Sequence, residues 1–214
     1  MIPWMWAATA GAHEPEHDHA TVQHRFDDAA KWAAVFDDPA RDAWQKPAEL
    51  VAALEITPGS TVADLGAGTG YFEPHLARAV GPDGVVLAID IEPNLIAHLT
   101  ERAATEQTPG VRPRLTDPSS AGLERKEADL VLIVDTYHHI DAREDYFRAA
   151  RAGVARGGRL VVVDFRTEVE IPVGPPPEHR LAPERVRSEL EAAGWTYDAS
   201  LDLLPYQYVL VFRR

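Results

Sequence analysis

The chain has 214 residues, of which 45% are hydrophobic, and a formal net charge of −13 at pH 7. This length and composition predict a globular protein with one domain and a sizeable core. The acidic balance, without any run of Lys and Arg, argues against a nucleic-acid substrate and against an anionic membrane partner, because both require a basic surface. The absence of cysteine excludes disulfides, thiolate metal ligands and thiol nucleophiles.

Residues 1–25 are expected to form a flexible, His-rich N-terminal tail. The first twelve residues are apolar and contain a cleavage-like Ala8-Thr9-Ala10 pattern, but they lack a positively charged start and are interrupted by Pro3. We therefore expect a cytoplasmic protein, with export through a degenerate signal as the alternative. The histidines of the tail match no zinc-ligand spacing, and we expect no metal site.

Residues 26–56 are expected to form a helical cover ahead of the main domain at 57–214. Apolar residues at helical spacing and the proline at position 47 predict three helices, over 26–36, 40–46 and 47–54. Trp44 and Gln45 are candidates for lid residues, and core packing is an equal alternative for Trp44.

The segment from Thr61 to Phe72, TVADLGAGTGYF, carries the strongest signal in the chain. An apolar strand ends at Asp64, and glycines follow at every second position, where a Cβ would obstruct a sharp turn or a closely approaching ligand. A helix over 71–80 and a second strand over 85–90 come next, and this strand ends in Asp90. In a nucleotide-binding βαβ unit, the helix N-terminus faces the ligand and such an acid accepts the ribose hydroxyls.

The rest of the chain alternates between predicted strands and helices, which indicates an α/β fold with a mostly parallel sheet. Residues 129–134, DLVLIV, are typical of a strand buried on both faces. We expect Gly157 and Gly158 to end the helix that follows. The further expected elements are helices over 92–107, 142–155 and 183–193, and strands over 111–115, 159–164, 195–203 and 206–212.

The glycine spacing, G-x-G-x-G with an acid two residues before it, differs from the dinucleotide fingerprint G-x-G-x-x-G. It resembles motif I of the class I S-adenosylmethionine-dependent methyltransferases of the small-molecule type, and the resemblance covers about residues 40–214. It implies a Rossmann-like seven-stranded sheet of order 3-2-1-4-5-7-6 with strand 7 antiparallel and helices on both faces. It also implies that the N-terminal helices cover the cofactor, S-adenosyl-L-methionine, and the acceptor.

The same resemblance implies roles for individual residues. The glycine loop is expected beneath the methionine and ribose, with Asp64 ordering it, Asp90 holding the ribose hydroxyls, Ile91 against adenine and Asp117 near the adenine amino group. Asp135 is expected beside the methionine or the acceptor. The expected cofactor-binding residues are Asp64, Gly66, Ala67, Gly68, Gly70, Asp90, Ile91, Asp117 and Asp135.

The segment after the fourth predicted strand places a carboxylate and two imidazoles where ligands bind in an open parallel sheet. Methyl transfer needs alignment, exclusion of water and, for some acceptors, removal of a proton. A histidine has a suitable ordinary pKa for that proton. The candidate catalytic residues are His139, the first choice by resemblance, His138 and Asp135; a purely structural role for either histidine is the alternative.

The predicted function is therefore methyl transfer from S-adenosylmethionine to a small-molecule acceptor. The alternatives are a catalytically silent protein that binds the cofactor and a nicotinamide-dependent oxidoreductase. The absence of cysteine argues against arsenite as the acceptor, and quinone C-methyltransferase signatures are missing. His179 and Arg180, after the Pro-rich loop at 171–177, are candidates for binding an acidic acceptor. The sequence does not indicate an oligomeric state.

Overall fold

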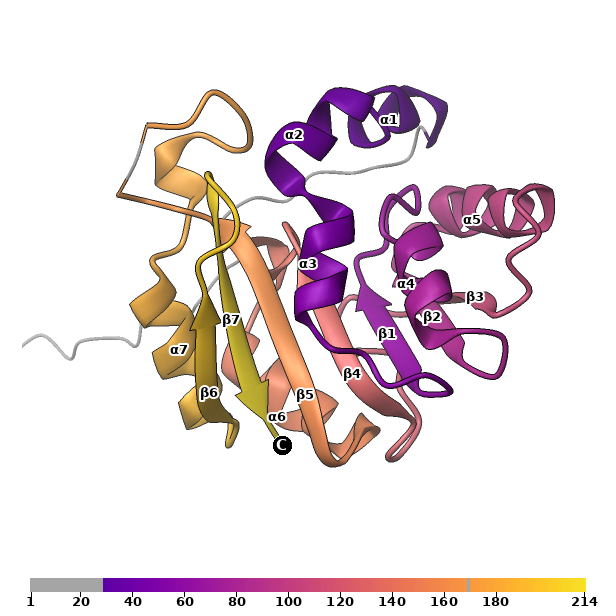
Figure 1. Ribbon diagram of the computed structural model, residues 1–214. Coiled ribbons are helices and arrows are strands. Elements are labelled where there is room, and N and C mark those ends of the chain that lie inside the picture. The colour runs from indigo at the N-terminus through magenta and orange to yellow at the C-terminus, as the bar shows by residue number, and fades with distance from the viewer. Residues whose placement is uncertain (1–28, 169) are drawn as a thin grey trace, which may run out of the picture.

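The computed structural model describes residues 29–168 and 170–214, and within them the chain forms one seven-stranded sheet (Figure 1). The strands lie in the order β3-β2-β1-β4-β5-β7-β6. Their bounds are β1 Thr61–Leu65, β2 Val85–Asp90, β3 Val111–Leu115, β4 Ala128–Val134, β5 Val154–Phe165, β6 Thr196–Leu201 and β7 Gln207–Arg213.

The strand directions confirm the predicted topology. Neighbouring strands from β3 to β5 pair in parallel, whereas β7 pairs antiparallel with both β5 and β6. The chain reverses its direction of winding between β1 and β4. In an open α/β sheet, a crevice at this reversal is where ligands bind.

Helices cover both faces of the sheet, as expected. On one face, α3, α4 and α5 contribute Leu50, Leu76 and Leu99 to an apolar layer; on the other, α6 and α7 contribute Phe147 and Leu190. The helix bounds are α1 Ala29–Phe36, α2 Asp42–Gln45, α3 Pro47–Ala53, α4 Glu73–Val80, α5 Pro93–Thr105, α6 Arg143–Ala150 and α7 Pro183–Ala192.

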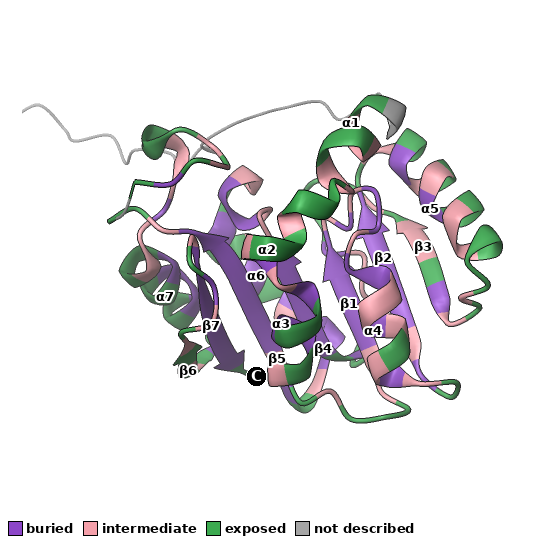
Figure 2. Ribbon diagram, turned by 45° about the horizontal axis from the view of Figure 1, so that its top comes forward, coloured by how far each residue is buried: buried purple, intermediate pink, exposed green. Residues whose placement is uncertain are grey.

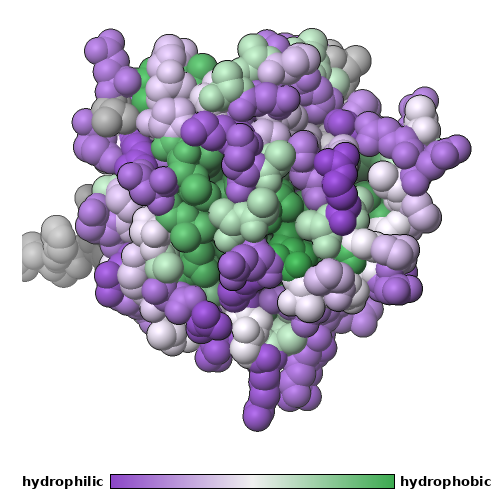
Figure 3. All heavy atoms as spheres, viewed as in Figure 1, coloured by the Kyte–Doolittle hydropathy of each residue, from purple (hydrophilic) through white to green (hydrophobic). Residues whose placement is uncertain are grey.

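The sheet is the most buried part of the molecule (Figure 2). All of β4 except Asp129 and Val134 is buried, which agrees with its continuous apolar sequence. Viewed from the face that carries α3 and α4, apolar residues lie beside α3 with polar residues around them (Figure 3). In the described part of the chain, no helix is both long and apolar enough to cross a membrane.

The predicted helix over 142–155 is too long. The helix α6 ends at Ala150, a short 3-10 turn spans Arg151–Gly153, and β5 begins at Val154. Gly153 packs so closely on Leu123 that an added Cβ would lie 2.4 Å from the Cβ of Leu123. Gly157 has a φ of +78° and lies inside β5, where the pairing with β4 shifts its register. The glycine pair that was expected to end a helix therefore belongs to an irregular strand.

The ends of β1 and β4 approach each other closely at the reversal of strand order. A Cβ on Gly66 would lie 2.3 Å from Oγ1 of Thr136, and the φ of Gly66 is +77°. On the β4 side, Asp135 adopts a left-handed φ of +55°, which is unusual for a residue with a side chain. The close approach positions the segment after β4 beside the glycine loop.

Replacement of Gly66 by Ala is expected to destabilise the protein by about 3 kcal/mol or more, since the new methyl group meets both a left-handed backbone and Thr136. Gly59→Ala is the matched control, because Gly59 has a φ of +84° but nothing within 4 Å of an added Cβ. The control should cost only about 1 kcal/mol. Chemical denaturation measures both; equal costs would contradict the proposed close packing.

Candidate functional site

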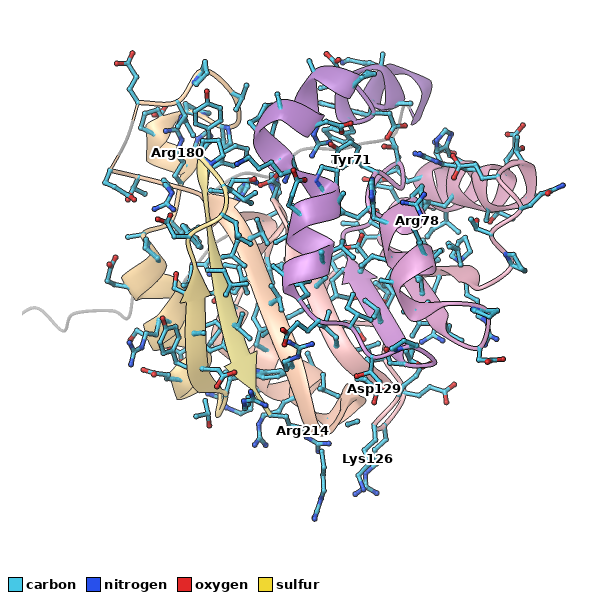
Figure 4. All side chains as sticks on the ribbon, in the orientation of Figure 1. Tyr71, Arg78, Lys126, Asp129, Arg180 and Arg214 are labelled. Atoms are coloured by element: carbon cyan, nitrogen blue, oxygen red, sulfur yellow. The ribbon has the colours of Figure 1, made fainter. Side chains whose placement is uncertain are left out.

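The residues expected to carry function meet at the edge of the sheet where the parallel strands end. Tyr71 and Arg180 lie at this edge, while Lys126, Asp129 and Arg214 lie at the opposite one (Figure 4). The helices α1 and α2 extend over the first edge (Figure 1). The site is thus built from strand ends, the loops that follow them and the N-terminal helices.

The glycine loop is fixed by the sheet on one side and open on the other. The backbone N–H groups of Gly66 and Ala67 both donate to the carbonyl of Ile89 at the end of β2, at 2.9 and 3.1 Å. Gly70 packs on α5, where an added Cβ would lie 2.7 Å from Leu99. Around Gly68, by contrast, the nearest atoms to an added Cβ are 3.8 Å away or more. Gly68 therefore presents backbone that a ligand can approach.

Asp90 joins the loop to the neighbouring strand. Its Oδ2 accepts the N–H of Gly68 at 2.9 Å, and its Oδ1 accepts the N–H of Glu92 at 3.0 Å. Burial raises the pKa of this carboxyl, and the backbone hydrogen bonds oppose the rise. Because each carboxylate oxygen accepts more than one hydrogen bond, Asp90 keeps the capacity to bind hydroxyl groups.

Two exposed apolar residues neighbour Asp90, one in the chain and one in the sheet. Ile91 is 46% exposed and Leu115, which pairs with Asp90 in the sheet, is 52% exposed. Asp117 is turned toward its own loop, where Oδ1 accepts hydrogen bonds from the backbone and side chain of Ser119 at 2.9 and 2.6 Å. These bonds lower the pKa of Asp117. The sequence analysis did not predict Leu115 as a site residue. A large apolar residue at the end of a parallel strand could have indicated a contact with the ligand.

Asp135 belongs to a polar network that joins three distant parts of the chain. It accepts hydrogen bonds from Gln207 at 2.5 Å and from Gln45 at 3.4 Å, and Gln45 donates to Gln207 at 3.1 Å. Arg41 donates to Gln45 at 2.7 Å and approaches Asp135 to 3.8 Å. Burial and the charge of Asp164 raise the pKa of Asp135 to about 6. Gln45 is therefore a buried network residue, a role that its sequence context did not reveal.

His138 and Asp164 form a buried pair across the ends of β4 and β5. Nδ1 of His138 lies 2.9 and 3.0 Å from the two oxygens of Asp164, and the two residues are 2% and 0% exposed. Burial lowers the pKa of His138, but the charge and hydrogen bond of Asp164 outweigh it, so that the net shift is upward. The ring of His139 packs against that of His138, with centroids 4.2 Å apart.

The segment that carries both histidines is held in place by hydrogen bonds to α7. Tyr137 is fully buried and its hydroxyl donates to Glu189 of α7 at 2.9 Å. Glu189 also accepts two hydrogen bonds from Arg143, at 2.8 and 3.1 Å. Because a buried ion pair with several hydrogen bonds is costly to break, this anchor restricts where His138 can move.

The N-terminal helices contact the glycine loop directly. Asp37 accepts a hydrogen bond from the hydroxyl of Thr69 at 2.9 Å and forms an ion pair with Arg102 at 3.1 Å. The guanidinium of Arg41 lies 4.4 Å from the ring centroid of Tyr71. Trp44 packs against Phe165 and Tyr206, so its contacts are aromatic. Residues 29–56 are the described part of the cover predicted at 26–56, and they thus contact the glycine loop and the residues beside it.

No described contact brings the candidate acceptor-binding residue Arg180 into this site. Nε of Arg180 donates to the carbonyl of Pro175 in its own loop at 2.8 Å. The His-rich segment at 11–25 lies outside the described residues. Among residues 29–168 and 170–214, no cluster of three His, Asp or Glu side chains is arranged to hold a metal ion.

Comparison with known proteins agrees with this geometry. A family model described as a methyltransferase domain matches residues 56–201, more than half of the chain. The chain is 28% identical over 109 residues to an arsenite methyltransferase from Halobacterium salinarum, spanning 51% of this chain and 28% of that protein. A ubiquinone/menaquinone biosynthesis C-methyltransferase from Ectopseudomonas mendocina is 28% identical over 111 residues, spanning 51% of this chain and 43% of its own. The chain thus spans less than half the length of these curated relatives.

A solved structure covers the chain more completely. The S-adenosylmethionine-dependent methyltransferase from Aquifex aeolicus aligns with a TM-score of 0.81 over 89% of this chain and 98% of its own, at 23% identity. That likeness supports the fold, and the family model supports the relationship. The chain belongs to the class I methyltransferases, the family whose cofactor is S-adenosyl-L-methionine.

Proposed function

We propose that this protein transfers a methyl group from S-adenosylmethionine to a small organic acceptor. The observation that carries the proposal is the convergence of two arrangements at one sheet edge. Asp90 binds the backbone of the open glycine loop, and the His138–Asp164 pair lies at the ends of β4 and β5. The first arrangement suits a nucleoside with a free ribose, and the second suits removal of a proton from an acceptor.

The residues around the loop fit the charge of the cofactor. S-adenosylmethionine carries an ammonium and a sulfonium and has no phosphate. Asp64 and Asp90 lie near the ends of the adjacent strands β1 and β2, and both are buried, at 3% and 7% exposure. Two acids in this position favour a cationic ligand and disfavour a pyrophosphate, which argues against the nicotinamide alternative.

We assign the cofactor-facing roles as follows. Gly66, Ala67, Gly68 and Gly70 form the loop against the methionine and ribose, Asp90 accepts the ribose hydroxyls, and Ile91 with Leu115 lies against the adenine. Asp117 is assigned to the neighbourhood of the adenine amino group, but its side chain accepts hydrogen bonds from Ser119. A contact between Asp117 and the adenine therefore requires its backbone or a movement of the loop. When bound, the cofactor supplies an activated methyl group, and the protein aligns the acceptor with it and excludes water.

We assign the proton acceptor to His138 in preference to His139. Asp164 accepts the hydrogen bond of Nδ1 and thereby leaves Nε2 as the basic nitrogen of the neutral ring. Its carboxylate also stabilises the ring after protonation, as the upward pKa shift indicates. Asp135, linked to Gln45 and Gln207, is placed to orient the acceptor beside this ring.

The acceptor is proposed to be an organic molecule with an ionisable O–H or N–H group. Without cysteine, the chain has no thiolate ligands for arsenic, so the arsenite chemistry named for one relative is not transferred to it. The cytoplasmic location expected from the sequence stays a prediction, as the N-terminal residues that bear on it lie outside the described part.

Turnover is tested by incubating the protein with S-adenosylmethionine and a panel of small phenols, amines and carboxylic acids. Release of S-adenosylhomocysteine together with the mass of a methylated product is the expected result. Cofactor binding without turnover on any member of a broad panel would favour a catalytically silent protein instead.

Asp90→Ala is expected to weaken cofactor binding by ~10-fold or more, since charge-assisted hydrogen bonds are worth about 1.5–3 kcal/mol. The matched control is Asp83→Ala, which removes an exposed acid from the turn at the other end of β2. Equilibrium dialysis measures both, with thermal unfolding to confirm that the variants are folded. Equal affinities for the two variants would contradict the assigned ribose contact.

His138→Ala is expected to reduce the turnover rate by about 100-fold on a hydroxyl acceptor, with cofactor affinity unchanged. The rate of the native protein should rise with pH through the raised pKa of His138, because the neutral ring is the base. Asp164→Asn should move that rise to lower pH. His139→Ala is the comparison, and a larger loss there than in His138→Ala would return the role to His139.

A further inference from the structure

Two carboxyl groups are buried together beneath the glycine loop. Asp64, at the end of β1, is 3% exposed, and Glu73, in the first turn of α4, is 4% exposed. Oε2 of Glu73 lies 3.3 Å from the position that a Cβ on Gly70 would occupy. Asp64 and Glu73 interact directly through their carboxyl groups. Glu73 has no role in the assignments made above.

Both carboxyl oxygens of Glu73 are buried, and no donor group of another residue in the described chain forms a hydrogen bond with them. The nearest cation, Arg102, is committed to Asp37 at 3.1 Å, to Glu106 at 2.8 Å and to the carbonyl of Thr69 at 3.0 Å. A carboxylate without donors is costly to bury, whereas a carboxylic acid beside a carboxylate satisfies both groups with one proton.

The charges that face the pair favour one shared proton. Burial, followed by the charge of Asp64, raises the pKa of Glu73 well above its ordinary value. The backbone N–H of Glu73 itself and the charge of Arg102 oppose this rise, and Asp37 adds to it. Burial and the charge of Asp90 raise the pKa of Asp64 to about 7, and the hydrogen bond with Glu73 opposes that rise. Glu73 is therefore the group that keeps its proton, and Asp64 is the group that titrates near neutrality.

We propose that Glu73 is a positioning residue for the cofactor: it stays a neutral carboxylic acid whose O–H donates to Asp64 and holds that carboxylate toward the cationic methionine end. The assignment rests on the proposed function, because the cation is that of S-adenosylmethionine or of its product. Binding of this cation favours the ionised Asp64. Below neutral pH, each binding event therefore releases a proton from Asp64 to the buffer.

The proposal gives a specific pH dependence of cofactor affinity. S-adenosylhomocysteine is the probe, because its ammonium remains largely charged below pH 7.5. Affinity should rise about eightfold from pH 6 to pH 7.5, as Asp64 ionises. Calorimetric enthalpies should depend on the ionisation enthalpy of the buffer at pH 6, as expected for proton release. Asp64→Asn should bind weakly and without this dependence.

Two variants, Glu73→Gln and Glu73→Leu, test whether Glu73 acts as a neutral acid that donates a hydrogen bond or as an anion. The amide N–H of Gln replaces the O–H, so Glu73→Gln should bind the probe within about threefold of the native protein at pH 7.5 and keep its pH dependence. Leu removes the donor, so Glu73→Leu should bind at least about threefold more weakly and shift the rise in affinity to higher pH. Equal weakening in both variants would show that Glu73 acts as an anion and would overturn the proposal.

The carboxyl pair can also be tested without any ligand. Asp64 has a folded pKa above its unfolded value, so the stability associated with its protonated form is present at low pH and is lost as pH rises through about 7. Asp64→Asn should therefore raise Tm by about 5 °C at pH 8 and much less at pH 5. An unchanged Tm at pH 8 would contradict the pair itself. Failure of the native protein to bind the probe would instead contradict the proposed function.

Discussion

The close approach of Gly66 to Thr136 is the constraint on which the site depends. It joins the end of β1 to the end of β4 at the point where the strand order reverses, with no room for a side chain on Gly66. It places the glycine loop and the segment bearing His138 at one edge of the sheet. Asp135, the first residue after β4, has a left-handed backbone conformation. Such a strained conformation persists only where the surrounding contacts hold it. The network through Gln207 supplies part of that enforcement.

Carboxyl groups dominate this edge, and their burial is unfavourable without a compensating cation. Four aspartates lie at or beside the ends of neighbouring strands: Asp64, Asp90, Asp135 and Asp164. Burial raises the pKa of the first three. Functional sites commonly hold such groups at a cost in stability, since the charge is needed for the ligand. Asp164 has a partner within the protein, because Nδ1 of His138 lies within hydrogen-bond distance of both of its oxygens. We infer that the cofactor supplies the corresponding positive charge beside Asp64.

Much of this fold could be predicted because its signals are local. The apolar segments indicate the strands, the family resemblance of the glycine loop implies their order, and the loop at 66–70 with Asp90 predicts the edge of the sheet where the ligand binds. The boundary between α6 and β5 could not be predicted, since Gly157 serves a strand irregularity set by pairing with β4. In the same way, the His138–Asp164 pair joins residues 26 positions apart, and Gln45 meets Gln207 across 162 positions. Such contacts are set by tertiary packing, which no local pattern encodes.

A crystal structure of the protein with S-adenosylhomocysteine would show directly where and in which orientation the ligand binds. We expect the ribose hydroxyls on Asp90, the adenine between Ile91 and Leu115, and the ammonium group on the side of Asp64. The sulfur should face the segment that carries His138. A ligand bound in the reverse orientation, or elsewhere on the protein, would contradict the assignment of this edge as the methyl-transfer site.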